Sequence, residues 1–155
     1  MHRWCITASA ASVAELQTAI EGVYALEEWH TDGKVLRPPH VEGRFILKND
    51  TVVSLRFNHE ESRQTAATQF GVGVYIIDES AFSYSYDNRA LFTQTPTGIF
   101  VSGSPGFGGM RRFTVLLEGN TVRLDSGEQQ FLFAPDSLAY SENGKLLRLY
   151  RRVRD

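Results

Sequence analysis

Short runs of β-forming residues, separated by tight turn signals, occupy most of this 155-residue chain. Asp32-Gly33, Asn49-Asp50 and Asn143-Gly144 are residue pairs that hairpin turns favour, because Asn, Asp and Gly accept positive φ angles. Connections of hairpin length make consecutive strands antiparallel neighbours. The pattern therefore predicts an all-β fold with an antiparallel sheet.

The first and last strands of this pattern are expected to pair, which would close the sheet into a barrel of about 8–10 strands. Runs rich in β-branched and aromatic residues predict strands near residues 22–30, 42–48, 51–57, 68–78, 80–87, 90–95, 98–103, 111–118, 120–125, 129–134 and 145–153. The polar segment 58–67 and the glycine-rich segment 102–109 are interpreted as longer loops. Long loops at a barrel mouth often control access to its interior.

The N-terminal segment predicts a short helix before the first strand. Ser12 and Glu15 have the spacing of a capping box, apolar residues follow at helical spacing, and Gly22 ends the pattern. We therefore expect residues 1–21 to pack as a helical segment on a barrel formed by residues 22–155. An export signal is the alternative for this segment; a packed helix predicts a cytoplasmic protein.

Composition narrows the classes of partner. A formal net charge of −2 provides no general attraction to nucleic acid or to a membrane surface, and no stretch has the apolar length of a transmembrane helix. The single cysteine, Cys5, excludes an intramolecular disulfide, and the histidines lack the spacing of metal ligands. We expect no metal and no cofactor, and a homodimer remains one option for assembly.

Alternation along one strand separates aromatic from small side chains. Phe82, Tyr84 and Tyr86 share one face of the predicted strand, and Ser83 and Ser85 share the other. We expect the aromatic face to be interior.

Arginines also occupy positions that must face inward. Arg111 and Arg112 are adjacent in a strand, so one of them points toward the core or a cavity. Arg148 and Arg152 share a face of the last strand, and a buried arginine must be paired or stacked. Tyr24 in the first strand is the expected stacking partner of Arg152 or Arg148, which would join the two ends of the chain.

Several short motifs carry a family resemblance. Gly22-Val23-Tyr24 resembles the Gly-X-Trp opening of the lipocalins and their calycin relatives, with Tyr24 in place of the tryptophan, and Tyr150-Arg151-Arg152 resembles the aromatic-X-Arg close of their last strand. Gly73-Val74-Tyr75, Met110-Arg111-Arg112-Phe113 and Gly119-Asn120 are similar to a strand, a second strand and a hairpin turn of the bacterial and fungal lipocalin-like domains. The resemblance implies a barrel that holds a small, mostly apolar molecule, and it implies no catalytic residues.

The expected function is therefore the binding of a small hydrophobic or amphipathic molecule, with an aromatic part and a carboxylate or enolate, inside the barrel. The pocket is expected to open near residues 102–109, with a lining drawn from Trp29, Phe45, Leu55, Tyr75, Tyr84, Tyr86 and Arg112. One alternative is a cofactor-free cyclase, isomerase or lyase that uses the same cavity. Another is an interaction module with a completely filled core.

Overall fold

The computed structural model describes residues 11–59, 66–95, 97–105 and 110–154. The described chain has one helix, α1 (Val13–Ile20), followed by strands only. The strands are β1 (Gly22–Thr31), β2 (Lys34–Leu36), β3 (Val41–Lys48), β4 (Thr51–Asn58), β5 (Ala66–Ile77), β6 (Ala81–Thr95), β7 (Gly98–Pro105), β8 (Arg111–Glu118), β9 (Thr121–Asp125), β10 (Gln129–Phe133), β11 (Ser137–Glu142) and β12 (Lys145–Val153).

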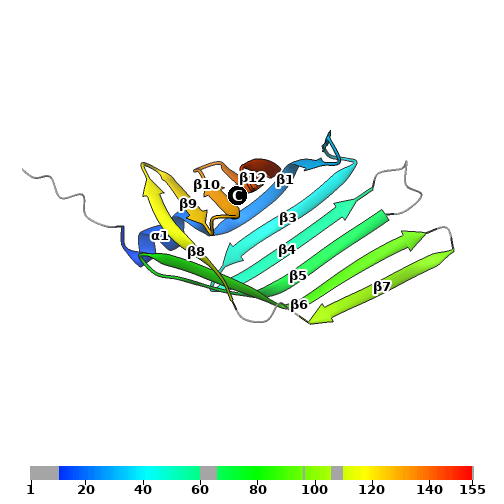
Figure 1. Cartoon of the computed structure of the whole chain (residues 1–155), viewed down its shortest axis with the longest axis horizontal. Coiled ribbons are helices and arrows are strands. Elements are labelled where there is room, and N and C mark those ends of the chain that lie inside the picture. The colour runs from blue at the N-terminus through cyan, green and yellow to red at the C-terminus, as the bar shows by residue number, and fades with distance from the viewer. Residues whose placement is uncertain (1–10, 60–65, 96, 106–109, 155) are drawn as a thin grey trace, which may run out of the picture.

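Ten of these strands form a closed antiparallel barrel, as the turn pattern predicted. Closure comes from β1 and β12, which pair with Tyr24 opposite Arg152 and Leu26 opposite Tyr150. β2 is an extra strand on β1, and β7 pairs with the far half of β6. Figure 1 shows β5, β6 and β7 extending together beyond the end of the barrel that lies away from α1.

The local signals produce the expected local structures. The backbone φ angles of Asp32 and Gly33 are 49° and 72°, and those of Asn143 and Gly144 are 49° and 76°, so both pairs turn the chain through the left-handed region. The Ser12 hydroxyl accepts a hydrogen bond from the Glu15 backbone N–H at 3.2 Å, which caps α1.

Three features of the sheet differ from the expectation. Residues 58, 66–67 and 102–105, which were interpreted as parts of two loops, belong to β4, β5 and β7. Residues 80–87 and 90–95 were predicted as separate strands, but β6 runs continuously, and an irregularity in its pairing with β5 leaves Asp87 unpaired. The short strands β2 and β11 were not predicted. β11 reads Ser-Leu-Ala-Tyr-Ser-Glu, in which small polar residues and alanine give a weak strand signal. β11 is therefore stabilised as a strand by its pairing with β10 on one side and β12 on the other, not by its own strand propensity.

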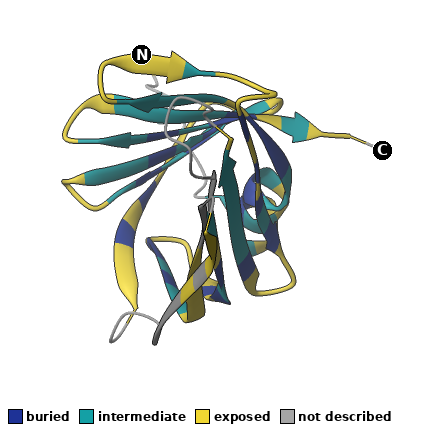
Figure 2. Cartoon of the chain, turned by 90° about the vertical axis from the view of Figure 1, so that its right-hand side faces the viewer, coloured by how far each residue is buried: buried dark blue, intermediate teal, exposed yellow. Residues whose placement is uncertain are grey.

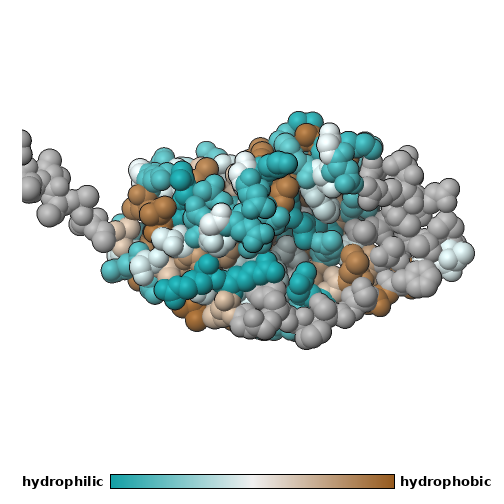
Figure 3. Space-filling model, in the orientation of Figure 1, coloured by the Kyte–Doolittle hydropathy of each residue, from teal (hydrophilic) through white to brown (hydrophobic). Residues whose placement is uncertain are grey.

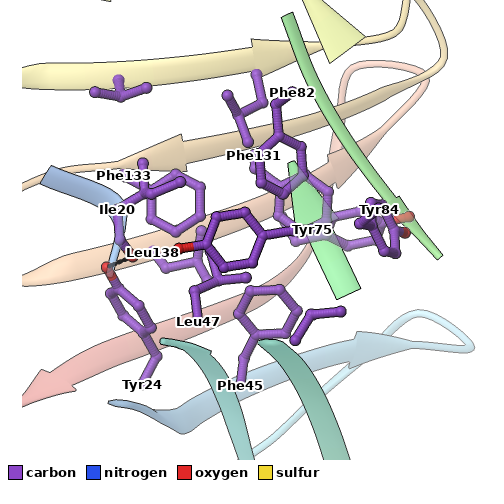
Figure 4. Packing of buried hydrophobic residues seen from close by; sticks show 14 of the residues in the cluster. Ile20, Tyr24, Phe45, Leu47, Tyr75, Phe82, Tyr84, Phe131, Phe133 and Leu138 are labelled. Carbon is purple, nitrogen blue, oxygen red and sulfur yellow. Dashed lines mark hydrogen bonds between the residues drawn. The ribbon is translucent and has the colours of Figure 1, made fainter. Parts of the chain in front are cut away.

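The barrel is filled at the end that α1 covers. Leu16 and Ile20 of α1 are buried against inward side chains of the sheet, and the hydroxyl of buried Tyr24 donates to the Ile20 carbonyl at 2.7 Å. Figure 4 shows Ile20 and Tyr24 at this end together with Leu47, Phe133 and Leu138 of the same core. Figure 2 shows exposed residues concentrated on the hairpin connections, with buried residues along the strands and helix.

Arg152 of β12 forms hydrogen bonds with the C-terminal end of α1 and with β1. Its Nη2 atom donates to the carbonyl oxygens of Ala19 at 2.8 Å and Glu21 at 2.9 Å, and to the Tyr24 hydroxyl at 2.7 Å. Its guanidinium lies 5.3 Å from the centre of the Tyr24 ring. The predicted contact between the two chain ends is therefore present, and it also satisfies carbonyls at the C-terminal end of α1.

The surface is polar over most of the view in Figure 3, where hydrophilic side chains cover much of the described part. In the described residues, the one helix is too short to cross a membrane.

Candidate ligand cavity

The barrel encloses a cavity of about 540 Å³ beyond its filled end. A barrel filled throughout would leave no such space. The cavity is lined by Phe45, Ser54, Arg56, Gln69, Phe70, Gly71, Tyr84, Tyr86, Arg89, Ala90, Leu91, Arg111, Gln129, Phe131, Leu138, Tyr140, Glu142, Arg148 and Tyr150.

The lining changes character along the barrel axis. Arg152 and Tyr75 mark the α1 end, because Arg152 contacts the Ala19 carbonyl and the Tyr75 hydroxyl donates to Glu21 Oε1 at 2.5 Å. Moving away from that end, the inward residues become aromatic and then polar or charged. β4 gives Val52, Ser54 and Arg56; β6 gives Phe82, Tyr84, Tyr86 and Arg89; β10 gives Phe133, Phe131 and Gln129; β11 gives Leu138, Tyr140 and Glu142; β12 gives Arg152, Tyr150 and Arg148.

Aromatic rings form the floor of the cavity. Phe131 lies at the centre of this floor, with its ring 5.8 Å from that of Phe45 and 4.8 Å from that of Tyr140. Tyr84 meets Tyr86 edge to face at 5.5 Å. Such a surface packs well against a flat apolar group.

Two glycines of β5 make room for Tyr86. A Cβ on Gly71 would lie 3.1 Å from the Tyr86 ring, and a Cβ on Gly73 would lie 1.8 Å from the Ser85 carbonyl oxygen. The ring therefore lies close against β5, where it lines the cavity beside Gly71. The Tyr86 hydroxyl also hydrogen bonds with Ser54 across the sheet.

Arg56 and Arg148 are half-buried cations on the wall above this floor. Arg56 donates to Gln69 Oε1 and lies 5.4 Å from the centre of the Trp29 ring. Burial, and then the nearby charge of Arg148, lower the pKa of Arg56 to about 10. Arg148 lies 4.3 Å over the Tyr140 ring, and its Nε is buried with no hydrogen-bond partner in the described part of the chain.

Two further arginines, Arg89 and Arg111, are more exposed and stand where β6 separates from its neighbours. β8 pairs with β6 only as far as Tyr84, opposite Arg111, and β7 pairs with β6 from Asn88 onward. Arg111 hydrogen bonds with Tyr84. Burial raises the pKa of the Tyr84 hydroxyl, and the positive charges of Arg111, Arg148 and Arg89 partly offset that increase.

Glu142 is the carboxylate of the described lining. The Tyr140 hydroxyl donates to Glu142 Oε1 at 2.5 Å and accepts from Gln129 Nε2 at 2.9 Å. Burial raises the pKa of Tyr140, and the hydrogen bond to Glu142 raises it further. Burial also raises the pKa of Tyr84 and of Tyr86. All three phenols are therefore protonated at neutral pH, and Tyr140 donates its hydroxyl proton to the hydrogen bond with Glu142.

Three of the predicted cavity residues line the cavity: Phe45, Tyr84 and Tyr86. Phe82 and Tyr84 are buried and Tyr86 is half-buried, so the aromatic face of β6 is interior, as expected. Trp29 is not one of the lining residues, but its ring centre lies 5.4 Å from the guanidinium of the lining residue Arg56. An irregularity in the pairing of β1 with β12 at Glu27 brings Trp29 opposite Arg148.

Three other predicted positions lie elsewhere. Leu55 alternates with the lining residues Ser54 and Arg56 and so faces away from the cavity. Tyr75 is buried under α1 in the filled end, where its hydroxyl is bound to Glu21. Arg112 is exposed on the other face of β8, and Arg111 takes the inward position.

Alternation within β8 distinguishes Arg111 from Arg112. Arg111 shares its face with Phe113 and Val115, which are buried, whereas Arg112 shares its face with Thr114. Arg148 was expected to be an alternative partner of Tyr24, but it packs on Tyr140 inside the cavity. Arg56 had no such signal, because the alternate residues Val53, Leu55 and Phe57 form the more apolar face of β4.

The opening was expected near residues 102–109. Of these, residues 106–109 lie outside the described residues. Lining residues 89–91 of β6 pair with residues 102–104 of β7, so the cavity reaches the strand that precedes this segment.

Comparison with known proteins gives no family. The chain matches no family model, no curated protein and no solved structure.

Proposed function

We propose that the barrel binds a small amphipathic anion, with its apolar or aromatic part on the ring floor and its acidic group among the arginines. The observation that carries this proposal is the polarity gradient of the inward face, from buried apolar and aromatic residues to polar and charged ones, with arginines at the far end of β4, β6 and β12. A molecule that matches the gradient has one apolar end and one acidic end. The proposal agrees with what the resemblance to the lipocalins implies.

The state of Arg148 supports an anionic ligand. A half-buried guanidinium without an ion-pair partner retains a desolvation cost, and a second guanidinium nearby adds repulsion. Neither Arg56 nor Arg148 forms an ion pair with a carboxylate within the described ranges. A bound acid would supply charge-assisted hydrogen bonds to both.

Trp29 provides a built-in reporter for the test. The chain has two tryptophans, Trp4 and Trp29, so the Trp4→Phe variant leaves Trp29 alone beside Arg56. We expect titration with 1-naphthoate to change Trp29 emission, and 1-naphthoate to displace an environment-sensitive anilinonaphthalene dye. 1-Naphthol should bind more weakly, since it lacks the charge.

Matched arginine variants locate the binding site. Arg148→Met should weaken 1-naphthoate by about tenfold or more, because one charge-assisted bond contributes about 1.5–3 kcal/mol. Arg112→Met removes the same charge from the outer face and should leave the affinity unchanged. Equal weakening by both variants, or no binding of dye and acid, would refute the proposal.

Catalysis in the same cavity is the second candidate. The hydrogen bond from Tyr140 to Glu142, under the guanidinium of Arg148, places a carboxylate, a phenol and a cation together. This set suits proton transfer in an isomerase, cyclase or lyase that needs no cofactor. Glu142→Gln would then abolish turnover while it preserved binding of 1-naphthoate, whereas a pure binding protein would produce no product from any ligand that it binds.

A further inference from the structure

We propose that the acidic group of the ligand is a dianion, such as a phosphate monoester or a vicinal dicarboxylate. This inference rests on the proposed function and narrows its ligand class. It comes from the charges that the described lining brings together: Arg56, Arg89, Arg111 and Arg148 against the single carboxylate Glu142.

The four arginines line the same cavity. They come from four different strands, β4, β6, β8 and β12, and so approach from different sides. Tyr84 interacts electrostatically with Arg89, Arg111 and Arg148, and Arg148 interacts with Arg56. The geometric basis of the proposal is that all four arginines line the same cavity, which also holds the ring floor.

Charge balance favours two negative charges over one. The inner cations Arg56 and Arg148, with Glu142 on the same wall, leave one positive charge that a monoanion would balance. Exposed Arg89 adds one more positive charge, so these four residues together leave two positive charges, which a dianion would balance. Arg111, which hydrogen bonds with Tyr84, is not counted in this balance. A chain of net charge −2 that concentrates four arginines on one cavity presents a strongly positive site locally.

The donor geometry also suits a group with several acceptor oxygens. Guanidiniums present planar forks that match phosphate and carboxylate oxygens in pairs. The protonated hydroxyl of Tyr84 can act as a further donor beside them. A single carboxylate has two oxygens and cannot occupy all of these donors at once.

Matched naphthyl compounds test the charge of the head group. Calorimetric titration at pH 7.5 and low salt would compare 1-naphthyl phosphate, its methyl diester and 1-naphthoate. The monoester is largely dianionic there, since its second pKa is about 6. We expect it to bind about tenfold or more tighter than the singly charged diester. At pH 5 the monoester is mostly a monoanion, and its advantage should largely disappear.

The outcomes separate this inference from the proposed function. If the three compounds bind equally, the head group is not selected as a dianion, but the amphipathic-anion function stands. If none of them binds, both fail.

Substitution on the exposed side tests the arginines that the inference adds. Arg89→Met should reduce the preference for monoester over diester, because it removes one of the two outer charges. Arg112→Met is the matched control and should keep the full preference. Arg89 is exposed, so this variant is expected to fold, and its urea midpoint verifies that. An unchanged preference in folded Arg89→Met would overturn the dianion assignment.

Discussion

Replacement of Arg152 by alanine should destabilise the barrel more than any other single surface-charge removal on β12. The Arg152 Nη2 contacts two carbonyl oxygens and one hydroxyl, but its two protons can serve only about two of them fully at once. A hydrogen bond with a charged partner contributes about 1.5–3 kcal/mol, and a cation–π contact at a wet site contributes about 0.5–1 kcal/mol. Because these terms are not additive and water replaces part of them, we expect a net loss of about 3 kcal/mol.

Urea unfolding measures this loss directly. With a slope of about 2 kcal/mol per molar urea, a loss of about 3 kcal/mol lowers the midpoint by about 1.5 M. Arg151→Ala is the matched control, since Arg151 is exposed and forms a 3.2 Å ion pair with exposed Glu27. A surface pair contributes about 0–1 kcal/mol. Arg152→Lys should fall between wild type and Arg152→Ala. If Arg152→Ala and Arg151→Ala shift the midpoint equally, Arg152 is not what joins the chain ends to α1.

Three other perturbations follow from the packing and titration behaviour. Gly73→Ala should lower the free energy of unfolding by about 3 kcal/mol or more, because the new Cβ would collide with the Ser85 carbonyl oxygen. Gly71→Ala should lower it by less, because the Tyr86 ring can move away from the new Cβ. Thermal unfolding of the two variants measures the difference. Alkali should destabilise the fold progressively above about pH 10. Tyrosines whose pKa is raised in the folded state contribute stability that is lost as the pH rises toward that pKa. Far-UV circular dichroism and tyrosinate absorbance should therefore change together, and ionisation of the tyrosines before unfolding would contradict the prediction. These tyrosines are Tyr24, Tyr75, Tyr84, Tyr86 and Tyr140. Hydrogen bonds from the backbone N–H groups that follow Asp78 lower the pKa of its carboxyl, so ionised Asp78 contributes to the stability of the fold. This contribution should be lost as the pH falls below about 4, and Asp78→Asn should show a smaller loss of stability over that range. An unchanged acid profile in Asp78→Asn would exclude a contribution from Asp78.

Most of the barrel could be predicted from local chemistry. Hairpin turns such as Asp32-Gly33 and Asn143-Gly144 depend on the φ angles that a few residue types accept, and those angles are as expected. The pairing of Tyr24 with Arg152 followed from two facts visible in the chain, an inward arginine that needs a partner and an aromatic residue at the opposite end.

The candidate site was only partly predictable, because pairing irregularities change which face a residue occupies. In β6 the bulge at Asp87 puts Arg89 on the same face as Tyr84 and Tyr86, although strict alternation would place it on the other face. In β1 the irregularity at Glu27 likewise changes the register, so that Trp29 pairs opposite Arg148. Such shifts depend on the partner strand and leave no mark in the local pattern.

The sequence by itself determined an antiparallel barrel, the turns that connect its strands, a capped helix at its start and an aromatic interior face on β6. Each of these depends on a short stretch of chain, where backbone preference and alternation decide. Only the tertiary structure decided that Arg56, Arg89, Arg111 and Arg148 share one cavity. These residues come from strands far apart in the chain, and the register, bulges and closure of the whole sheet bring their charges together.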